Sequence, residues 1–355
     1  MPDASFLALL VLALAGCGPH VHPMTSVDDG VTQSNALLET LPADQPGCSI
    51  AVSQEGVVLW SGARGLADVA SQRPLDTNSI FDIASTSKQF TALAVLLLAR
   101  DGALTLNDSL ASRVSGLPAW ANDVTLEQLM HHTSGIPDYG DLLAKRGVEL
   151  TAPSTQADAL TALASATLDF MPGSKFTYSN SNYLLLAEVV NAVTGKSLPA
   201  LLDERVFKPL QLDMRMDPAF EAPAVAVPYV MRGLALTASR SRWLQLGDGS
   251  IFTTPSQLAR WGDNYRTGAV GGLELITAAL QAAVPTDTPG DRYGPGIDLA
   301  TNGSLSHSGA WSGFATVFVV SADRSRVLAM SCNSFEMNAP TTVGQGLMTI
   351  WLEGH

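Results

Sequence analysis

Three short stretches of the chain hold residue types that can carry out acyl transfer. The first is Ser85-Thr86-Ser87-Lys88, in which a hydroxyl and an amine are three residues apart. Residues at this spacing share one face of a helix, so the Lys88 amine can reach the Ser85 hydroxyl. A serine hydroxyl becomes a good nucleophile when a base takes its proton. The pair indicates a nucleophile and its base, although an N-capping serine beside a solvated lysine fits these residues equally well.

The element that follows Ser85 favours this interpretation. Residues 86–100 form a long apolar run that predicts a buried helix ending at Asp101-Gly102. The start of a helix carries free N–H groups and the positive end of the dipole, which disfavour a nearby cation. We therefore expect a lowered pKa for Lys88, which would help it to act as a base.

The second stretch is Tyr178-Ser179-Asn180. A phenol close to an ammonium group can pass a proton between a nucleophile and a leaving group. The Asn180 amide can hold both the lysine and a substrate. The alternative is a loop tyrosine that packs beside a helix N-cap.

The third stretch is His307-Ser308-Gly309-Ala310, inside a predicted strand. Gly309 lets the backbone approach a ligand and leaves the Ala310 N–H free to donate. Together with the Ser85 N–H it would form an oxyanion hole, in which each donor is worth roughly 3–4 kcal/mol. The alternative is a half-buried strand histidine followed by a bulge at Gly309.

Strand patterns occur near both ends of the chain and helical patterns occur between them. The expected strands are 48–53, 57–61, 304–311, 313–321 and 326–333. The expected helices are 31–41, 86–100, 125–131, 157–166, 181–193, 198–206, 255–265 and 341–352.

This order of elements predicts an α/β (α+β) fold. An antiparallel sheet built from both chain ends and flanked by helices would form one lobe, from about 31–100 and 290–355. A large, mostly helical insertion, about 101–289, would form the second lobe, and ligand sites favour the cleft between two such lobes. Cys48 and Cys332 lie in strands that this fold brings side by side, where a disulfide and two buried thiols both remain open.

The charge balance excludes some classes of partner. The chain has 20 Lys and Arg against 33 Asp and Glu, a net charge of −13. This argues against nucleic acid and against binding an anionic lipid surface through basic side chains. Six histidines and three cysteines are scattered, so we expect no metal and no cofactor.

The N-terminus has the pattern of an export signal. Residues 6–15 are apolar, which is too short for a membrane-spanning helix of about twenty residues but typical of a secretory signal. Asp3 and the lack of Lys or Arg before this run leave the true start open, and a frayed apolar terminus is the alternative.

The end of this run, Leu14-Ala15-Gly16-Cys17, resembles a bacterial lipobox. The resemblance implies a signal peptide at 1–16, a lipidated Cys17 and a tether at 17–30. Two acyl chains on Cys17 would anchor the protein on the periplasmic side of a bacterial membrane.

In their types and order, the S-x-x-K, Y-x-N and H-x-G motifs resemble the β-lactamase-related, penicillin-binding-protein-like serine hydrolases. This family includes class C β-lactamases, D-Ala-D-Ala carboxypeptidases, D-aminopeptidases and esterases. The resemblance covers about residues 31–352. Further family-like segments are 129–139, 172–173, 193–197, 247–254 and 293–296.

The resemblance implies a role for each motif residue. Ser85 would be acylated, Lys88 would be its base, and Tyr178 would shuttle protons. The residues that would bind the substrate or its oxyanion are Asn180, His307, Ser308, Gly309 and Ala310.

One motif residue departs from the class C pattern. His307 stands where those enzymes have lysine, and histidine is mostly neutral at pH 7. We therefore expect an esterase or a D-Ala-carboxypeptidase-like enzyme that cleaves small esters, D-amino-acid amides or peptides. The alternatives are a β-lactamase and a catalytically retired protein that binds cell-wall fragments. The sequence leaves the natural substrate and the oligomeric state open.

Overall fold

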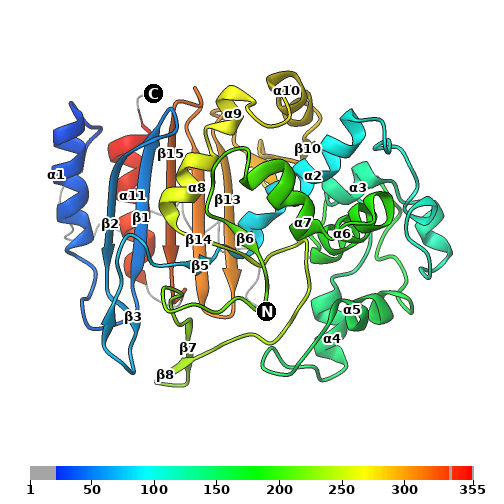
Figure 1. Ribbon diagram of the computed structural model, residues 1–355, viewed down its shortest axis with the longest axis horizontal. Coiled ribbons are helices and arrows are strands. Elements are labelled where there is room, and N and C mark those ends of the chain that lie inside the picture. Colours follow the sequence, from blue (N-terminus) through cyan, green and yellow to red (C-terminus); the bar gives the residue numbers. More distant parts are fainter. Residues whose placement is uncertain (1–20, 336–337, 354–355) are drawn as a thin grey trace.

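The centre of the molecule is an antiparallel sheet of eight strands (Figure 1). A computed structural model of the chain describes residues 21–335 and 338–353. The strands of this sheet are β1 (Cys48–Gln54), β2 (Val57–Arg64), β10 (Val284–Pro285), β11 (Arg292–Gly294), β12 (Ile297–Leu299), β13 (Leu305–Trp311), β14 (Phe314–Val320) and β15 (Arg326–Cys332). Their order is β10-β11-β12-β13-β14-β15-β1-β2, so both chain ends build one sheet, as expected.

Helices cover the two faces of the sheet. α1 (Val27–Leu38) and α11 (Asn338–Trp351) pack together on one face, and α8 (Pro255–Trp261) packs on β1 and β15. Alternate residues of β1 belong to different cores: Ile50 packs on the α1 and α11 side and Ala51 on the α8 side. Side chains alternate along a strand, so a strand covered on both faces needs apolar residues on both.

The first helix starts earlier than the sequence analysis expected. Ser26 caps α1 by accepting a hydrogen bond from the Asp29 N–H at 3.2 Å, and Asp28 also lies in the first turn, where negative charge is favourable. Residues 27–30, assigned to the tether, are therefore helical. The signal peptide, Cys17 and the beginning of the tether lie outside the described residues.

The helices of the second lobe come from the first part of the expected insertion, 101–289, whose later part contributes α8 and β10 to the sheet lobe instead. They are α3 (Leu126–Met130), α4 (Tyr139–Lys145), α5 (Gln156–Leu163), α6 (Asn180–Thr194), α7 (Leu198–Leu202) and a π-helical turn (Asp203–Phe207). α2 (Lys88–Arg100) is buried from Lys88 to Leu98, because it packs against α6 and α7 in the core that joins the lobes. Within residues 21–335 and 338–353, no single helix is long and apolar enough to cross a membrane; α6 and the segment 198–207 meet that test only as a pair bent by 75°.

Several short elements were not expected from the sequence. They are α4, β10, β11 and β12, whose bounds are given above, and β3 (Leu66–Asp68), β4 (Arg73–Pro74), β5 (Phe81–Asp82), β6 (Arg215–Met216), β7 (Tyr229–Arg232), β8 (Ala235–Ala238), β9 (Ile251–Thr253), α9 (Asn264–Thr267), α10 (Leu273–Gln281) and 3-10 turns at Ala84–Ser87, Leu110–Ser112 and Ala119–Asn122. β5, β9 and β6 form a small sheet that leads the chain into the turn carrying Ser85. Strands of two or three residues are too short for a periodic pattern to reveal them.

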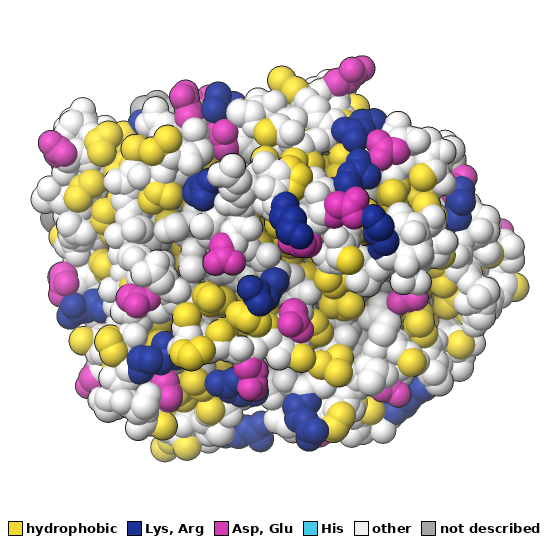
Figure 2. Space-filling view, viewed as in Figure 1, with side chains coloured by type: hydrophobic (Ala, Val, Ile, Leu, Met, Phe, Trp, Pro, Cys, Tyr) yellow, Lys and Arg dark blue, Asp and Glu magenta, His cyan; other side chains and the backbone are white. Residues whose placement is uncertain are grey.

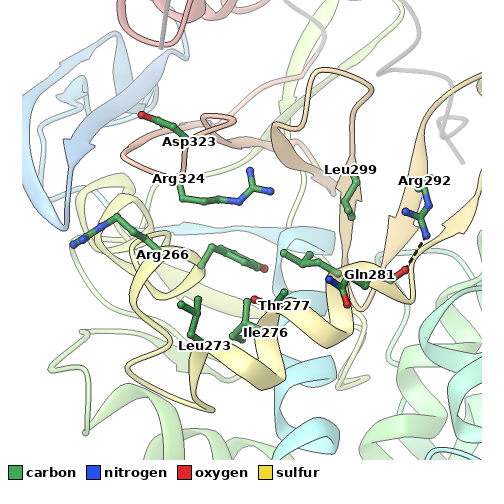
Figure 3. A pocket seen from close by; sticks show the side chains of 11 residues that line it. Arg266, Leu273, Ile276, Thr277, Gln281, Arg292, Leu299, Asp323 and Arg324 are labelled. Carbon is green, nitrogen blue, oxygen red and sulfur yellow. Dashed lines mark hydrogen bonds between the residues drawn. The ribbon is translucent and has the colours of Figure 1, made fainter.

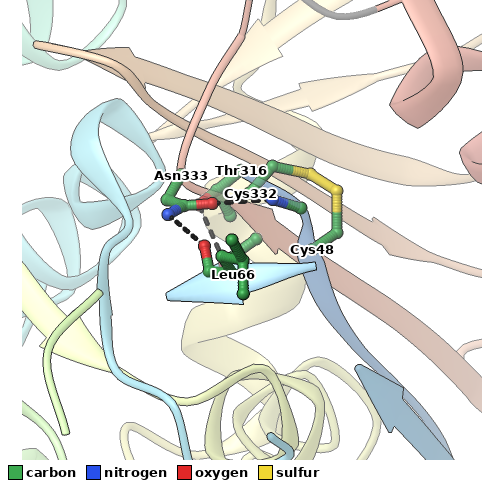
Figure 4. The surroundings of a disulfide bond; sticks show 7 residues. Cys48, Leu66, Thr316, Cys332 and Asn333 are labelled. Carbon is green, nitrogen blue, oxygen red and sulfur yellow. Dashed lines mark hydrogen bonds between the residues drawn. A yellow bond between two sulfur atoms is a disulfide. The ribbon is translucent and has the colours of Figure 1, made fainter. Parts of the chain in front are cut away.

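A disulfide joins the two ends of the sheet lobe (Figure 4). Cys48 and Cys332 are directly opposite in the register of β1 and β15, with Cα atoms 4.0 Å apart. Beside the bond, Asn333 donates to the Leu66 carbonyl and accepts from the Gly47 N–H. This answers the question that the sequence left open.

Removing this bond is expected to destabilise the fold. It closes a loop with a sequence separation of 284 residues, and cross-links of long loops restrict the unfolded chain most. We predict that a Cys48→Ala, Cys332→Ala double variant loses about 2–5 kcal/mol of unfolding free energy. Urea unfolding of both proteins, with and without reductant, measures this. Equal midpoints for variant and oxidised wild type would contradict it.

Candidate active site

Ser85 lies in a tight turn between β5 and α2. The turn Ala84–Ser87 is a 3-10 helix, and α2 begins at Lys88, two residues later than expected. The Asp82 carboxylate fixes its start by accepting from the Ala84 N–H at 2.9 Å, while Ala84 has a left-handed φ of 49°. A 3-10 helix has three residues per turn, so Ser85 and Lys88 lie on the same side.

Lys88 is fully buried, and three acceptors surround its amine. Nζ lies 3.1 Å from Ser85 Oγ, 2.7 Å from Asn180 Oδ1 and 2.7 Å from the Asp248 carbonyl oxygen. A lysine ammonium has three N–H donors, and all three are used. The structure thus brings together the first motif and Asn180 of the second.

The surroundings of Lys88 favour its neutral form. Burial is the main cause and lowers the pKa of Lys88 to about 8, against the opposing charges of Asp248 and Asp138. Desolvation disfavours the charged amine. The direction of the pKa shift agrees with the prediction from the sequence, but its main cause is burial and not the helix dipole.

Loss of one proton turns this amine into a base aimed at Ser85. The Asn180 and Asp248 oxygens accept only, so a neutral Lys88 keeps its two N–H bonds to them. The lone pair then occupies the third direction, toward Ser85 Oγ. This geometry allows Lys88 to take the hydroxyl proton.

The pKa of Lys88 leads to a pH prediction. The neutral amine increases as pH rises, so kcat/KM for an uncharged ester should rise through about pH 8 and level off above it. Asp248→Asn removes a charge that raises the pKa of Lys88, and should move this limb to lower pH. Activity that is flat from pH 6 to 10 in both proteins would contradict the assignment.

Tyr178 stands beside the amine in an aromatic setting. Lys88 Nζ lies 5.0 Å from the centre of its ring, and the His132 ring packs on it at 4.2 Å. Burial raises the pKa of Tyr178 well above its ordinary value, although the nearby Ser85 hydroxyl lowers it. The buried phenol makes no well-oriented hydrogen bond to a described residue. Tyr178 is thus a neutral phenol at physiological pH.

His132 holds the tyrosine loop in place, a function that the sequence analysis did not assign. Its Nδ1 accepts from the Ser179 N–H at 3.2 Å and from the Asn182 amide at 2.9 Å. Burial is the main cause that lowers the pKa of His132 well below its ordinary value, so the ring is neutral. The segment 129–139 had been noted as family-like, but only the fold shows which ring His132 contacts.

Gly309 lets β13 pass close to the turn that carries Ser85. A Cβ at this position would lie 2.2 Å from the Ile83 carbonyl oxygen, so a larger residue would push the strand away. Ala310, the next residue, is exposed, and Ser308 is half-buried. The third motif therefore adjoins the first, as the oxyanion-hole hypothesis requires.

The His307 side chain lies inside the protein. Its Nδ1–H donates to the Ser308 carbonyl at 2.6 Å, and its Nε2 accepts from the Tyr293 hydroxyl at 3.1 Å. Burial, with a smaller effect from Lys88, lowers the pKa of His307 to about 3. Its ring is therefore neutral and holds the Tyr293 hydroxyl. The sequence predicted that His307 lines the substrate site, but the buried ring offers no charged group to a substrate.

Other features in the described part of the chain do not compete with this site. A cavity of about 470 Å³ lies between α9, α10 and the β11–β12 edge of the sheet (Figure 3). Its lining includes Arg266, Arg292 and Arg324 but no residue of the three motifs. No group of three His, Cys, Asp or Glu side chains among the described residues could hold a metal ion.

The sequence of this chain is similar to that of known proteins along most of its length. The family model described as Beta-lactamase matches residues 35–348, most of the chain. The chain belongs to the β-lactamase family. This confirms the resemblance inferred from the motifs, and the chain is a serine hydrolase of that family.

The similar proteins of the β-lactamase family include penicillin-binding proteins and D-aminopeptidases. A penicillin-binding protein of Bacillus subtilis is 27% identical over 84% of this chain and 71% of its own length. A D-aminopeptidase of Cereibacter sphaeroides is 38% identical, over 46% of this chain and only 31% of its own length. The octameric penicillin-binding protein homologue from Pyrococcus abyssi has the same fold, with a TM-score of 0.77 at 22% identity over 92% of this chain and 78% of that one.

Proposed function

We propose that this β-lactamase-family protein hydrolyses small esters or D-amino-acid amides and peptides through an acyl-enzyme on Ser85. The observation that carries the proposal is the fully buried Lys88 amine, 3.1 Å from Ser85 Oγ and held by two other acceptors. At a pKa of about 8, about a tenth of this amine is neutral at pH 7. A retired binding protein has no chemical need for a buried amine that is held beside a serine hydroxyl in this way.

In the proposed acylation, Lys88 takes the Ser85 proton as Oγ bonds to the substrate carbonyl carbon. The Ser85 and Ala310 N–H groups stabilise the oxyanion. When the tetrahedral intermediate collapses, the leaving alcohol or amine takes a proton from Tyr178, which regains one from Lys88. In deacylation, water gives a proton to the same pair, attacks the acyl carbon and releases the acid, and Oγ regains its proton.

The charges around the site favour substrates without a carboxylate. His307 is neutral and buried, so it gives no fixed cation at that place. Two partly buried acidic residues, Asp138 and Asp248, lie nearby, and their charges raise the pKa of Lys88. An anionic β-lactam or a D-Ala carboxylate is therefore disfavoured, whereas a neutral ester or the ammonium of a D-amino-acid amide is not. The D-aminopeptidase relative makes the latter a suitable first substrate.

A matched pair of substrates tests this preference. D-alanyl-D-alaninamide and D-alanyl-D-alanine share the D-Ala–D-Ala bond and end in a neutral amide and a carboxylate, respectively. We expect kcat/KM for cleavage of that shared bond, measured by the release of free D-alanine from the first residue, to be about tenfold or more higher for the amide. Ser85→Ala gives the background rate. Equal or better cleavage of the free dipeptide, or rapid turnover of penicillin, would contradict the proposed substrate class and favour the carboxypeptidase or β-lactamase alternative.

We also propose that the protein is anchored in the cell envelope through Cys17. The support is the Leu14-Ala15-Gly16-Cys17 pattern after an apolar run of ten residues. In cells that produce the full chain, the acylated protein should be present in the membrane fraction. It should be absent from that fraction when the cells produce the Cys17→Ala variant. Metabolic labelling with a clickable fatty acid tests this, and equal labelling of both proteins would overturn it.

A further inference from the structure

The β7–β8 hairpin exposes a group of large apolar side chains. Residues 231–236 are all exposed, and Leu234, in the turn, is exposed by 100%. Met231 and Leu236, exposed by 41% and 38%, are directly opposite each other in the register. Directly opposite residues of a hairpin point to the same face. Figure 1 shows the hairpin at the lower edge of the molecule.

The hairpin and the residues that flank it are basic, although the whole chain is acidic. Residues 222–247 contain Arg232, Arg240 and Arg242 but no Asp or Glu, while the whole chain has a net charge of −13. Arg240 lies 3.6 Å from Glu221, and Arg232 and Arg242 form no salt bridge with any other described residue. Figure 2 shows hydrophobic and Lys or Arg surface side by side at this edge, with some Asp or Glu between them, and Asp68 accepts a hydrogen bond from the Tyr229 hydroxyl at the base of the hairpin. Charges beyond about 10 Å are screened, so this local charge decides what binds here.

The base of the hairpin is fixed to the rim of the active site. The Tyr229 N–H donates to the Asn333 carbonyl at 2.8 Å, and Ser312 Oγ donates to the Ser239 carbonyl at 2.6 Å. Ser312 comes two residues after Ala310, at the end of β13. The base of the hairpin is therefore held beside the end of the strand that carries the third motif.

We propose that the β7–β8 hairpin binds an anionic lipid bilayer, with Leu234 entering the boundary between headgroups and acyl chains and the arginines contacting lipid phosphates. Exposed apolar residues flanked by basic ones are typical of interfacial anchors. A partner protein fits less well, because a specific interface buries about 800 Å² on each side and this hairpin has only two strands of four residues each. The net charge of the whole chain predicted that it would not bind an anionic lipid surface. That sum hides the local excess of arginine around the hairpin.

Vesicle binding of the full chain tests the proposal. Binding is compared between vesicles of phosphatidylcholine alone and vesicles that also contain phosphatidylglycerol. Leu234→Asp should weaken the lipid partition coefficient on anionic vesicles about tenfold or more. Arg232→Glu should weaken it about fivefold or more. All proteins carry residues 1–20, so any contribution of that segment is common to every comparison.

Two matched variants control for general effects. Leu273→Asp changes an apolar residue that is 50% exposed on α10, and Lys145→Glu reverses an exposed charge on α4; both should bind as wild type does. Hydrolysis of a soluble ester should be equal in all four variants, which shows that they are folded. Ester hydrolysis also distinguishes failure of the lipid-binding proposal from failure of the proposed catalytic function, because lipid binding and hydrolysis are measured separately.

A tryptophan at the tip locates the contact directly. Leu234→Trp should show additional fluorescence quenching by brominated lipids, beyond that of the six native tryptophans. No additional quenching, or equal partition of wild type and Leu234→Asp, would overturn the proposal. A change in oligomeric state on Leu234→Asp without vesicle binding would also overturn it, in favour of a second copy of the chain.

Discussion

Replacing Ser85 by alanine is expected to lower kcat/KM for a p-nitrophenyl ester by about 10,000-fold or more. The methyl group cannot bond to the acyl carbon, so only the oxyanion donors and substrate binding would remain. The fold should be unaffected, because the hydrogen bond that Ser85 Oγ makes in the described structure is to the Lys88 amine. Steady-state kinetics measures the loss, after the rate of ester hydrolysis in buffer without enzyme has been subtracted.

Ser87→Ala is the matched control for this substitution. Ser87 is a fully buried serine in the same turn, and its Oγ accepts a hydrogen bond from the Ile251 N–H at 3.2 Å. Its loss should cost stability of about 1 kcal/mol and change kcat/KM less than tenfold. Equal activity of wild type and Ser85→Ala would reject Ser85 as the nucleophile.

Replacing Lys88 by methionine is expected to lower kcat/KM by about 100- to 10,000-fold, the typical contribution of a general base. Methionine has a similar length and is apolar, so it fills the buried space without an amine. The limb of the pH profile at about pH 8 should disappear with it. The loss should fall on kcat more than on KM, because the base acts in the transition state.

Stability must be measured alongside the activity of Lys88→Met. The substitution removes a buried charge but leaves Asn180 Oδ1 and the Asp248 carbonyl without this donor. An unpaired buried acceptor costs about 1–3 kcal/mol. A folded variant that retains the pH limb would show that another group is the base.

The sequence was sufficient to predict the parts of the site whose spacing is local. Ser85 and Lys88 meet because three residues make one turn, and the long apolar run after them could only be a buried helix. The antiparallel sheet from both ends followed from strand patterns at 48–53 and 326–333, which pair in the structure.

Contacts made across the fold could not be predicted in the same way. Asp248 supplies a carbonyl to Lys88 from 160 residues away, and His132 packs on Tyr178, which is not near it in sequence. Whether Cys48 and Cys332 join depended on strand register, which a shift of one residue would have changed. The burial that governs the pKa of Lys88 and His307 is likewise a property of the packed core.

Local capping and short elements explain the remaining differences. α1 begins at Val27 because Ser26 caps it, although the apolar spacing becomes clear only from Val31. The β7–β8 hairpin has strands of four residues with exposed apolar side chains, so it lacks the alternation that marks a half-buried strand.

The most direct test of the central claim is to identify the residue that carries the acyl group. Wild type is treated with a fluorophosphonate, and the modified peptide is located by mass spectrometry, with the rate followed in Lys88→Met. We predict one adduct on Ser85, formed far more slowly without Lys88. An adduct on another residue, or equal rates in both proteins, would contradict the account.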